Sequence, residues 1–158
     1  MEIKTKLYFF NSDIFLSLQG EDAKADKRKT LNQHGKTIIF NRISRKMLPS
    51  ILYEFLSTPA GLQEWFADKV DERDNIFSFS WNGSTDRAEV LEAEENSFIR
   101  YRWTHAASNE YFEFRIEKSE VSNQTILIIK DFAEKRDIAD QTRLWDVQVH
   151  DLFHRLGN

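Results

Sequence analysis

Residues 47–66 read MLPSILYEFLSTPAGLQEWF, and this stretch predicts two short helices in direct succession. The first helix has its apolar residues at helical spacing, at Leu48, Ile51, Leu52, Phe55 and Leu56. Pro49 is tolerated in its first turn. Ser57 and Thr58 then supply a hydroxyl cap, and Pro59 occupies the first position of a second helix. That second helix carries Leu62, Trp65 and Phe66.

The chain on either side of these helices has the pattern of β-strands. A β-rich run from Thr37 to Ile43 precedes the helices. After the charged turn at 71–75, five more runs follow at 76–81, 87–93, 98–103, 111–116 and 125–130. Turn-forming residues such as Asn82-Gly83 separate them, which predicts an antiparallel meander.

The end of the chain predicts one long helix over residues 134–156, with Gly157 as its stop. At about 100° per residue, one narrow apolar stripe collects Ile138, Trp145, Val149, Leu152 and Leu156. A helix of this length can cross a whole sheet. The order of the elements therefore predicts an α+β fold, in which a curved sheet wraps around the last helix.

The composition fits one domain with one core. The 158 residues include 13 Phe, 4 Trp and 4 Tyr but only 5 Gly and 2 Pro, which is a high aromatic share. The net charge is −4 and the basic residues are scattered, so nucleic acid is not expected as a partner. There is no cysteine, which suits a reducing cytoplasm.

The first 35 residues differ from the rest. Residues 20–36 are charged and nearly free of large apolar side chains, as in a linker. The apolar run from Leu7 to Leu18 is broken by Asn11, Ser12 and Asp13, so we expect neither a secretory signal nor a membrane span there. We expect residues 1–35 to form an N-terminal appendage or a partly disordered extension, and residues 36–158 to form the domain.

Several segments resemble START-like proteins of the SRPBCC, or helix-grip, superfamily. They are residues 51–68 (ILYEFLSTPAGLQEWFAD), 77–83 (FSFSWNG), 112–116 (FEFRI) and the close at 144–157. The leucine-rich helix followed by Thr-Pro-x-Gly-Leu-x-x-Trp-Phe carries most of this resemblance. The chain is most similar to small bacterial stand-alone members, and more distantly to the activator of heat-shock-protein ATPase and the polyketide cyclase/dehydrase branch. The resemblance implies a cavity between the curved sheet and the long helix.

The alternation of side chains along the strands permits a test of this implied cavity. Aromatic and aliphatic residues collect on one face, while Ser78, Ser80, Arg100, Arg102, Glu113 and Arg115 collect on the other. Arg100 or Arg102 is placed to pair with Glu113 across strands. The expected cavity lining is Trp65, Phe66, Phe79, Trp81, Tyr101, Trp103, Phe112, Phe114, Trp145 and Val149. Whether a ligand or the rings themselves fill this space is left open.

No catalytic residue, metal site or cofactor is predicted. Asp146, His150 and His154 have the i, i+4, i+8 spacing of metal ligands but lie on the side of the helix away from Trp145, so we expect them in solvent. The acidic groups at 92–95 and 71–74 fall in turns and are interpreted as solvated charge. The aromatic face offers no evident ionisable group for acid–base chemistry.

Three functions remain open. The first is binding of a small hydrophobic ligand, a lipid or a polyketide-like molecule, in the cavity. The second is a protein-interaction module similar to the activator of heat-shock-protein ATPase, working through Arg100, Arg102 and Arg115 or through the edge of the sheet. The third is a cyclase- or aromatase-type enzyme that uses Tyr101 at the cavity mouth. A homodimer is also left open.

Overall fold

A computed structural model describes residues 30–31 and 36–157, and side chains from residue 42 onward together with that of Lys36. The elements in chain order are β1 (Thr30–Leu31), β2 (Lys36–Arg45), α2 (Pro49–Ser57), α3 (Pro59–Gln63), β3 (Lys69–Arg73), β4 (Ile76–Trp81), β5 (Ser84–Glu94), β6 (Phe98–Trp103), β7 (Phe112–Lys118), β8 (Thr125–Glu134) and α4 (Ile138–Arg155). The predicted appendage lies outside the described residues, except that β1 pairs with β2.

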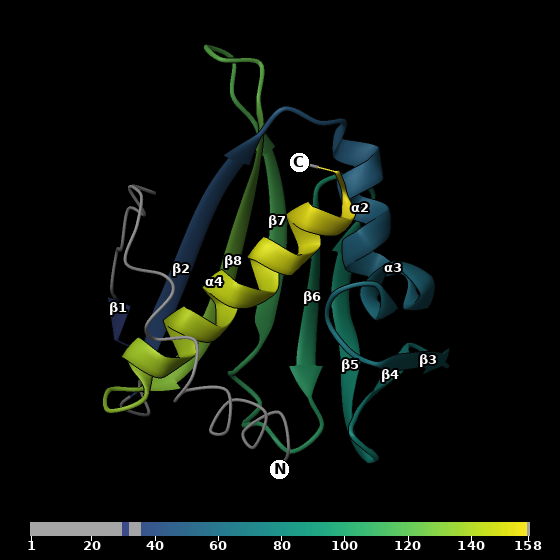
Figure 1. The fold of residues 1–158 in the computed structure, drawn as a ribbon. Coiled ribbons are helices and arrows are strands. Elements are labelled where there is room, and N and C mark those ends of the chain that lie inside the picture. Colours follow the sequence, from purple (N-terminus) through teal and green to yellow (C-terminus); the bar gives the residue numbers. More distant parts are fainter. Residues whose placement is uncertain (1–29, 32–35, 158) are drawn as a thin grey trace.

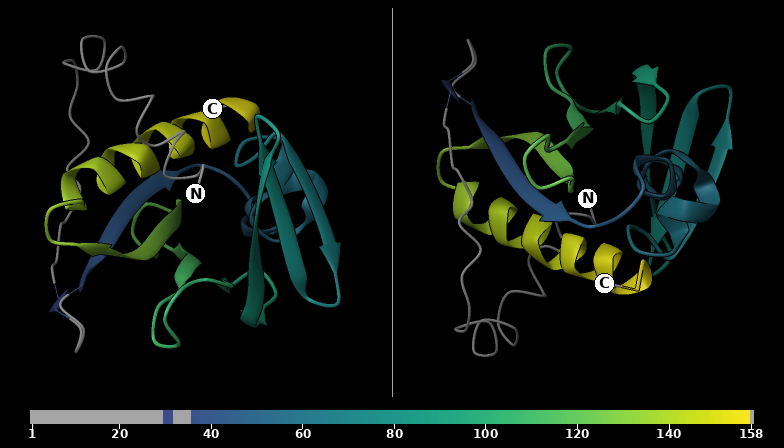
Figure 2. Two further views of the ribbon diagram at one scale, coloured as in Figure 1. Left: turned by 90° about the horizontal axis from the view of Figure 1, so that it is seen from below. Right: turned by 90° about the horizontal axis from the view of Figure 1, so that it is seen from above.

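The strands form one antiparallel sheet of eight strands in the order β1-β2-β8-β7-β6-β5-β4-β3. The first long strand, β2, pairs with the last strand along its whole length, from Lys36 opposite Glu134 to Arg45 opposite Thr125. The strand that precedes the two short helices thus lies beside the last strand of the meander. Figure 1 shows α4 crossing one side of the curved sheet, and Figure 2 shows the sheet bending around that helix. The predicted α+β helix-grip fold is confirmed.

The meander contains one strand more than the sequence analysis predicted. Residues 71–75 were interpreted as a charged turn, but Lys69–Arg73 is strand β3, which pairs with β4 at the edge of the sheet. The turn itself is only Asp74 and Asn75, whose positive φ values of 54° and 63° suit a two-residue hairpin. A strand at the edge needs only one buried side chain, here Val70, so its charged residues concealed it.

The C-terminal helix also begins later than predicted. Residues 134–137 do not belong to it, because β8 continues to Glu134 and α4 begins at Ile138. Its end is as predicted: Gly157 has a φ of 78° and its N–H donates to the carbonyl of His154. From the predicted stripe, Trp145, Val149 and Leu152 are buried, while Ile138 and Leu156 are half-buried.

The two short helices meet at a close contact that only glycine permits. Thr58 caps α3 as predicted, since its hydroxyl accepts from the N–H of Gly61 at 3.0 Å. A Cβ on Gly61 would lie 2.4 Å from the carbonyl oxygen of Glu54 and 2.6 Å from Cα of Phe55, both on the backbone of α2. The absence of a side chain therefore sets how closely α3 packs on α2.

Gly61→Ala should destabilise the domain severely, because the added methyl group meets backbone that cannot rotate away. We expect a loss of about 3 kcal/mol or more in the free energy of unfolding, measured by urea denaturation. Gly83→Ala is the matched control. Its Cβ meets nothing within 4 Å, and its φ of 86° makes strain the main cost, about 1 kcal/mol. Equal losses in the two variants would refute the close-contact explanation.

Candidate functional site

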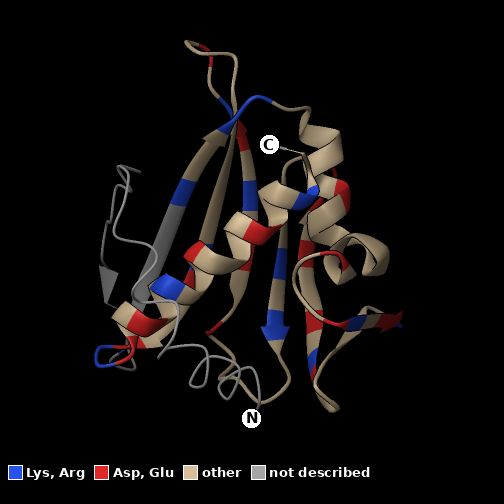
Figure 3. Ribbon diagram, in the orientation of Figure 1, with Lys and Arg blue, Asp and Glu red and all other residues tan. Residues whose placement is uncertain are grey.

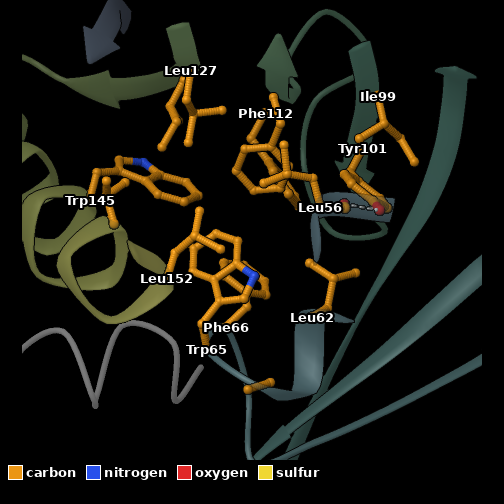
Figure 4. Close-up of a cluster of buried hydrophobic side chains, with 14 of the residues drawn as sticks. Leu56, Leu62, Trp65, Phe66, Ile99, Tyr101, Phe112, Leu127, Trp145 and Leu152 are labelled. Carbon is orange, nitrogen blue, oxygen red and sulfur yellow. Dashed lines mark hydrogen bonds between the residues drawn. The ribbon is translucent and has the colours of Figure 1, made fainter. Parts of the chain in front are cut away.

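The predicted cavity lining converges in the interior between the sheet and α4. All its members are buried except Trp103, which is half-buried. They come from the segment after α3 (Trp65, Phe66), from β4 (Phe79, Trp81), β6 (Tyr101, Trp103) and β7 (Phe112, Phe114), and from α4 (Trp145, Val149). Figure 4 shows the side chains from α4, the sheet and the α3 segment pointing toward one another. The alternation along the strands therefore assigned these side chains to the correct face of the sheet.

Phe66 lies at the centre of this cluster. Its ring centroid is 5.1 Å from that of Phe79, 6.0 Å from that of Trp145 and 6.1 Å from that of Phe112. Further rings surround it at Trp65, Trp81, Trp103 and Phe114. Edge-to-face and stacked contacts at such distances are the normal geometry of a packed aromatic core. The predicted lining thus packs mostly against itself.

The polar atoms of these rings are bonded inside the protein. The indole N–H of Trp65 donates to the carbonyl of Phe55 at 2.9 Å, and that of Trp81 donates to the carbonyl of Phe66 at 2.8 Å. The hydroxyl of Tyr101 donates to the carbonyl of Leu56 at 2.9 Å. The Trp65 bond joins the α3 segment to α2, while the Trp81 and Tyr101 bonds join the sheet to the α3 segment and to α2.

Tyr101 does not lie at a cavity mouth, as the enzyme hypothesis supposed. Its side chain is fully buried, and Figure 4 shows it directed toward Leu56. Burial raises the pKa of its hydroxyl well above the usual value, and the nearby Tyr53 raises it further. A phenol buried this deeply, with its proton bonded to backbone, cannot serve substrate chemistry.

A pocket of about 530 Å³ opens at one end of the sheet, next to the start of α4. Its walls come from Lys36 at the start of β2, the connection between β6 and β7, the end of β8 and the first turns of α4. They comprise Lys36, Asp86, Trp103, His105, Ala106, Ala107, Glu110, Tyr111, Asp131, Phe132, Ala133, Glu134, Asp137 and Gln141. Trp103 joins this pocket to the aromatic interior, because its ring lies 4.9 Å from that of Phe112.

Asp131 is the functional candidate that the sequence analysis missed. Its side chain lies in the pocket wall and the residue is only 8% exposed. Its Oδ2 accepts from the indole N–H of Trp145 at 2.9 Å and from the amide of Gln141 at 2.8 Å, and its Oδ1 accepts from the N–H of Phe132. Burial raises the pKa of this carboxyl group, although these three hydrogen bonds oppose the rise.

The signal for Asp131 was present in the sequence. The predicted strand ended at residue 130, but the inward alternation of Leu127 and Ile129 continues through Asp131 to Ala133. Extending the strand would have placed one carboxylate on the aromatic face. The statement that this face has no evident ionisable group is therefore wrong.

Two further carboxylates of the pocket have basic partners. Lys36 Nζ lies 2.8 Å from Oε2 of Glu110, which is itself 8% exposed. His105 Nδ1 lies 3.3 Å from Oδ1 of Asp86, and the imidazole stacks on Trp103. The pocket therefore combines an aromatic wall with a polar, ordered rim.

A second hollow of about 640 Å³ lies between the α3 segment and α4. It is lined by Gln63, Glu64, Trp65, Phe66, Ala67, Asp68, Leu144, Val147, Gln148, Asp151, His154 and Arg155. Only Trp65 and Phe66 of the predicted lining reach it, and both are almost completely buried. This hollow lies on the outside of the aromatic core.

The outer face of the sheet carries ordered ion pairs. Arg100 pairs with Glu113 at 2.6 Å and with Glu92 at 3.0 Å, so the predicted cross-strand pair is confirmed for Arg100. Arg102 instead pairs with Glu89 and donates to the carbonyl of Ser108. Burial by itself would raise the pKa of Glu113, but hydrogen bonds from Arg115 and Arg100 lower it below its usual value.

The metal-like triad of the last helix lies in solvent. Asp146, His150 and His154 are all exposed, and Figure 3 shows charged residues spaced along α4. Within residues 30–31 and 36–157, no group of three or more His, Cys, Asp or Glu side chains is arranged to hold a metal ion. Over the same residues, no helix is long and apolar enough to cross a membrane.

An aromatic core gripped between a curved antiparallel sheet and a terminal helix defines a helix-grip protein. The chain matches the START-like superfamily domain over residues 35–158 and belongs to that superfamily. A comparison with curated proteins gave no match.

Solved structures share this fold. A Bacteroides fragilis protein, BfR322, is 32% identical over 76% of this chain and 90% of its own, with a TM-score of 0.56. The Aha1 dimer of Colwellia psychrerythraea is 22% identical over 73% of this chain and 92% of its own, with a TM-score of 0.63. CalU16 of Micromonospora echinospora is 14% identical over 82% of each chain, with a TM-score of 0.61. The last two support the fold alone.

Asp131→Asn should change how stability depends on pH. Between 3.8, the usual pKa of an aspartate, and the raised pKa of Asp131, the folded protein binds the proton more tightly than the unfolded chain does. Stability from this group therefore falls as the pH rises through that window. We expect the free energy of unfolding of the wild type to fall relative to that of Asp131→Asn over this window, in urea titrations at a series of pH values.

Glu113→Gln provides the opposite sign as a control. The pKa of Glu113 is lowered, so its contribution is present above the usual value of 4.5 and is lost as the pH falls through the lowered pKa. The wild type should therefore gain stability over this variant as the pH rises from acid. Parallel stability curves for the wild type and Asp131→Asn would contradict a buried, perturbed carboxyl group.

Proposed function

We propose that this protein binds a small hydrophobic molecule at the open end of the space between the sheet and α4. The observation that carries the proposal is the pocket of about 530 Å³, whose volume falls in the usual range for small-molecule sites. Trp103, the predicted lining residue that is only half-buried, forms part of its wall. The aromatic cluster behind Trp103 makes that wall rigid. A cytoplasmic location, inferred from the absence of cysteine, is part of this proposal.

The packing of the core limits the size and shape of the ligand that can bind. A long acyl chain would need the space that Phe66 occupies at the centre of the aromatic cluster. A compact ring system needs only the pocket itself, where it can lie against Trp103 and Tyr111. Between the two ligand types considered from the sequence, this arrangement favours a polyketide-like molecule over a lipid. Micromolar affinity corresponds to about 8 kcal/mol.

A tryptophan placed at the pocket should block ligand binding. Ala107 lines the pocket and is exposed, so Ala107→Trp fills the space without disturbing the core. We expect it to lower the affinity for the bound molecule at least about tenfold, or by about 1.4 kcal/mol, in titrations followed by tryptophan fluorescence. Native mass spectrometry of protein purified from its own cells, before and after denaturation, supplies the molecule to be titrated.

The matched control is Ala60→Trp, an exposed alanine on α3 that does not line the pocket. It should bind the ligand as the wild type does. If the protein releases no small molecule and a panel of aromatic polyketides changes neither its fluorescence nor its melting temperature, the binding function is refuted. Equal weakening by both tryptophans would refute the location of the site.

A second candidate function is a protein-interaction module that acts through the outer face of the sheet. The observation in its favour is that Arg100, Arg102 and Arg115 are held in position by carboxylates and remain partly accessible. The edge strand β3 is a poorer docking surface, because the charged side chains along it oppose pairing with another strand. This function is favoured if Arg102→Glu abolishes capture of a partner while ligand titrations give no signal. The same preparations, run by analytical ultracentrifugation, test for a homodimer.

An enzymatic function of the cyclase type has one supporting observation, the buried carboxylate in the pocket wall. Asp131 lies where a bound ring system would meet it, and acid–base catalysis needs such a titratable group near the substrate. Its hydrogen bonds come from Phe132 of β8 and from Gln141 and Trp145 of α4. Turnover of a polyketide by the wild type, absent in Asp131→Asn, is the result that would favour this function over binding alone.

A further inference from the structure

The charge of the pocket at the open end is strongly one-sided. Its walls contain the carboxylates Asp86, Glu110, Asp131, Glu134 and Asp137 against a single lysine, Lys36, and the imidazole of His105. A site that binds a purely apolar molecule does not need this excess of acid, and a pocket that binds an anion would have the opposite sign. The excess of acidic side chains therefore favours a ligand with a positively charged group over one with a negatively charged group.

The other four carboxylates of the pocket lie beside basic side chains. Glu110 pairs with Lys36 at 2.8 Å, and Asp86 with His105 at 3.3 Å. Arg136 lies 3.0 Å from Glu134 and 3.8 Å from Asp137. Glu110, Glu134 and Asp137 thus lie beside charged side chains of the protein, and Asp86 lies beside an imidazole.

Asp131 differs from them in its partners. Its three hydrogen bonds come from an indole, an amide side chain and a backbone N–H, all of them uncharged. Within the described part of the chain, no Lys, Arg or His side chain pairs with it, and the like charge of Glu110 adds to the effect of burial in raising its pKa. The residue is only 8% exposed, and a carboxylate this buried is costly unless a positive charge compensates it.

We infer that the ligand of this pocket carries a protonated amine, which pairs with Asp131 while its ring system lies against Trp103. This inference rests on the proposed binding function and adds the chemical class of the ligand to it. An ammonium group supplies the positive charge that Asp131 lacks, and its hydrogen atoms match the carboxylate lone pairs that Trp145, Gln141 and Phe132 leave unused. The faces of Trp103 and Tyr111 add a favourable surface for a cation.

Three probes that share a naphthalene ring and differ in the charge of its substituent test this inference on the unmodified protein. They are 1-naphthylmethylamine, 1-naphthylmethanol and 1-naphthoate, titrated at neutral pH with tryptophan fluorescence and calorimetry. We expect the amine to bind at least about tenfold more tightly than the alcohol, and the carboxylate to bind most weakly. Ala107→Trp should lower the affinity for the amine and for the alcohol equally, because the tryptophan fills the volume that both probes need.

Asp131→Asn should remove the advantage of the amine and leave the affinity for the alcohol within about twofold. Glu95→Gln, an exposed carboxylate outside the pocket, is the matched control and should change neither affinity. Because Asp131 also holds Trp145, Glu110→Gln is tested in parallel; it removes a pocket charge without touching α4 and should reduce the preference in part.

The outcomes separate the two proposals. If the alcohol binds as tightly as the amine, or the carboxylate binds best, the amine inference is overturned while the binding function stands. If none of the three probes binds and native mass spectrometry finds no small molecule, both are overturned. An amine preference that survives in both Asp131→Asn and Glu110→Gln would also overturn the assignment of Asp131 as its partner.

Discussion

The packing of Phe66 between the sheet and α4 is the contact on which the rest of this structure depends. Phe66 leaves the α3 segment and meets rings from β4, β6, β7 and α4, so a single side chain joins every layer of the domain. Gly61 allows α3, the helix that precedes Phe66, to pack closely on the backbone of α2. With the centre filled by rings, the space that remains for a ligand lies at the end of the sheet, where Trp103 closes the aromatic cluster.

Asp131 both lines this pocket and joins the sheet to α4. It sits on the inner face of β8, two residues beyond the last aliphatic side chain of the row, and holds Trp145 and Gln141 of α4. One carboxylate thus fixes the start of the terminal helix to the sheet and lines the pocket beside it. The Asp131 carboxylate, which holds α4 in place, is thus also available to bind a ligand. Burying its charge costs free energy, and a cationic ligand would offset that cost.

Much of this structure could be predicted from the sequence. The strict alternation along residues 77–81, 99–103 and 112–116 assigned the aromatic rings to one face, because the side-chain period of a strand leaves no other choice. Local chemistry placed the Thr58 cap and the Gly157 stop. Strand β3 and the last part of β8 were missed, since an edge strand and a strand end contain charged residues that resemble turns. The same error hid Asp131.

The sequence by itself indicated the α+β order of elements and, through a family resemblance, the helix-grip class. It also determined the inward aromatic face and the stripe of Trp145, Val149 and Leu152, because these follow from periodicity within single elements. Only the tertiary structure decided that the rings fill the centre, that Tyr101 is fully buried and bonded to Leu56, and that a pocket forms around Asp131. Those features depend on how side chains from distant elements share one volume. Periodicity within an element fixes the direction of a side chain but not what occupies the space in front of it.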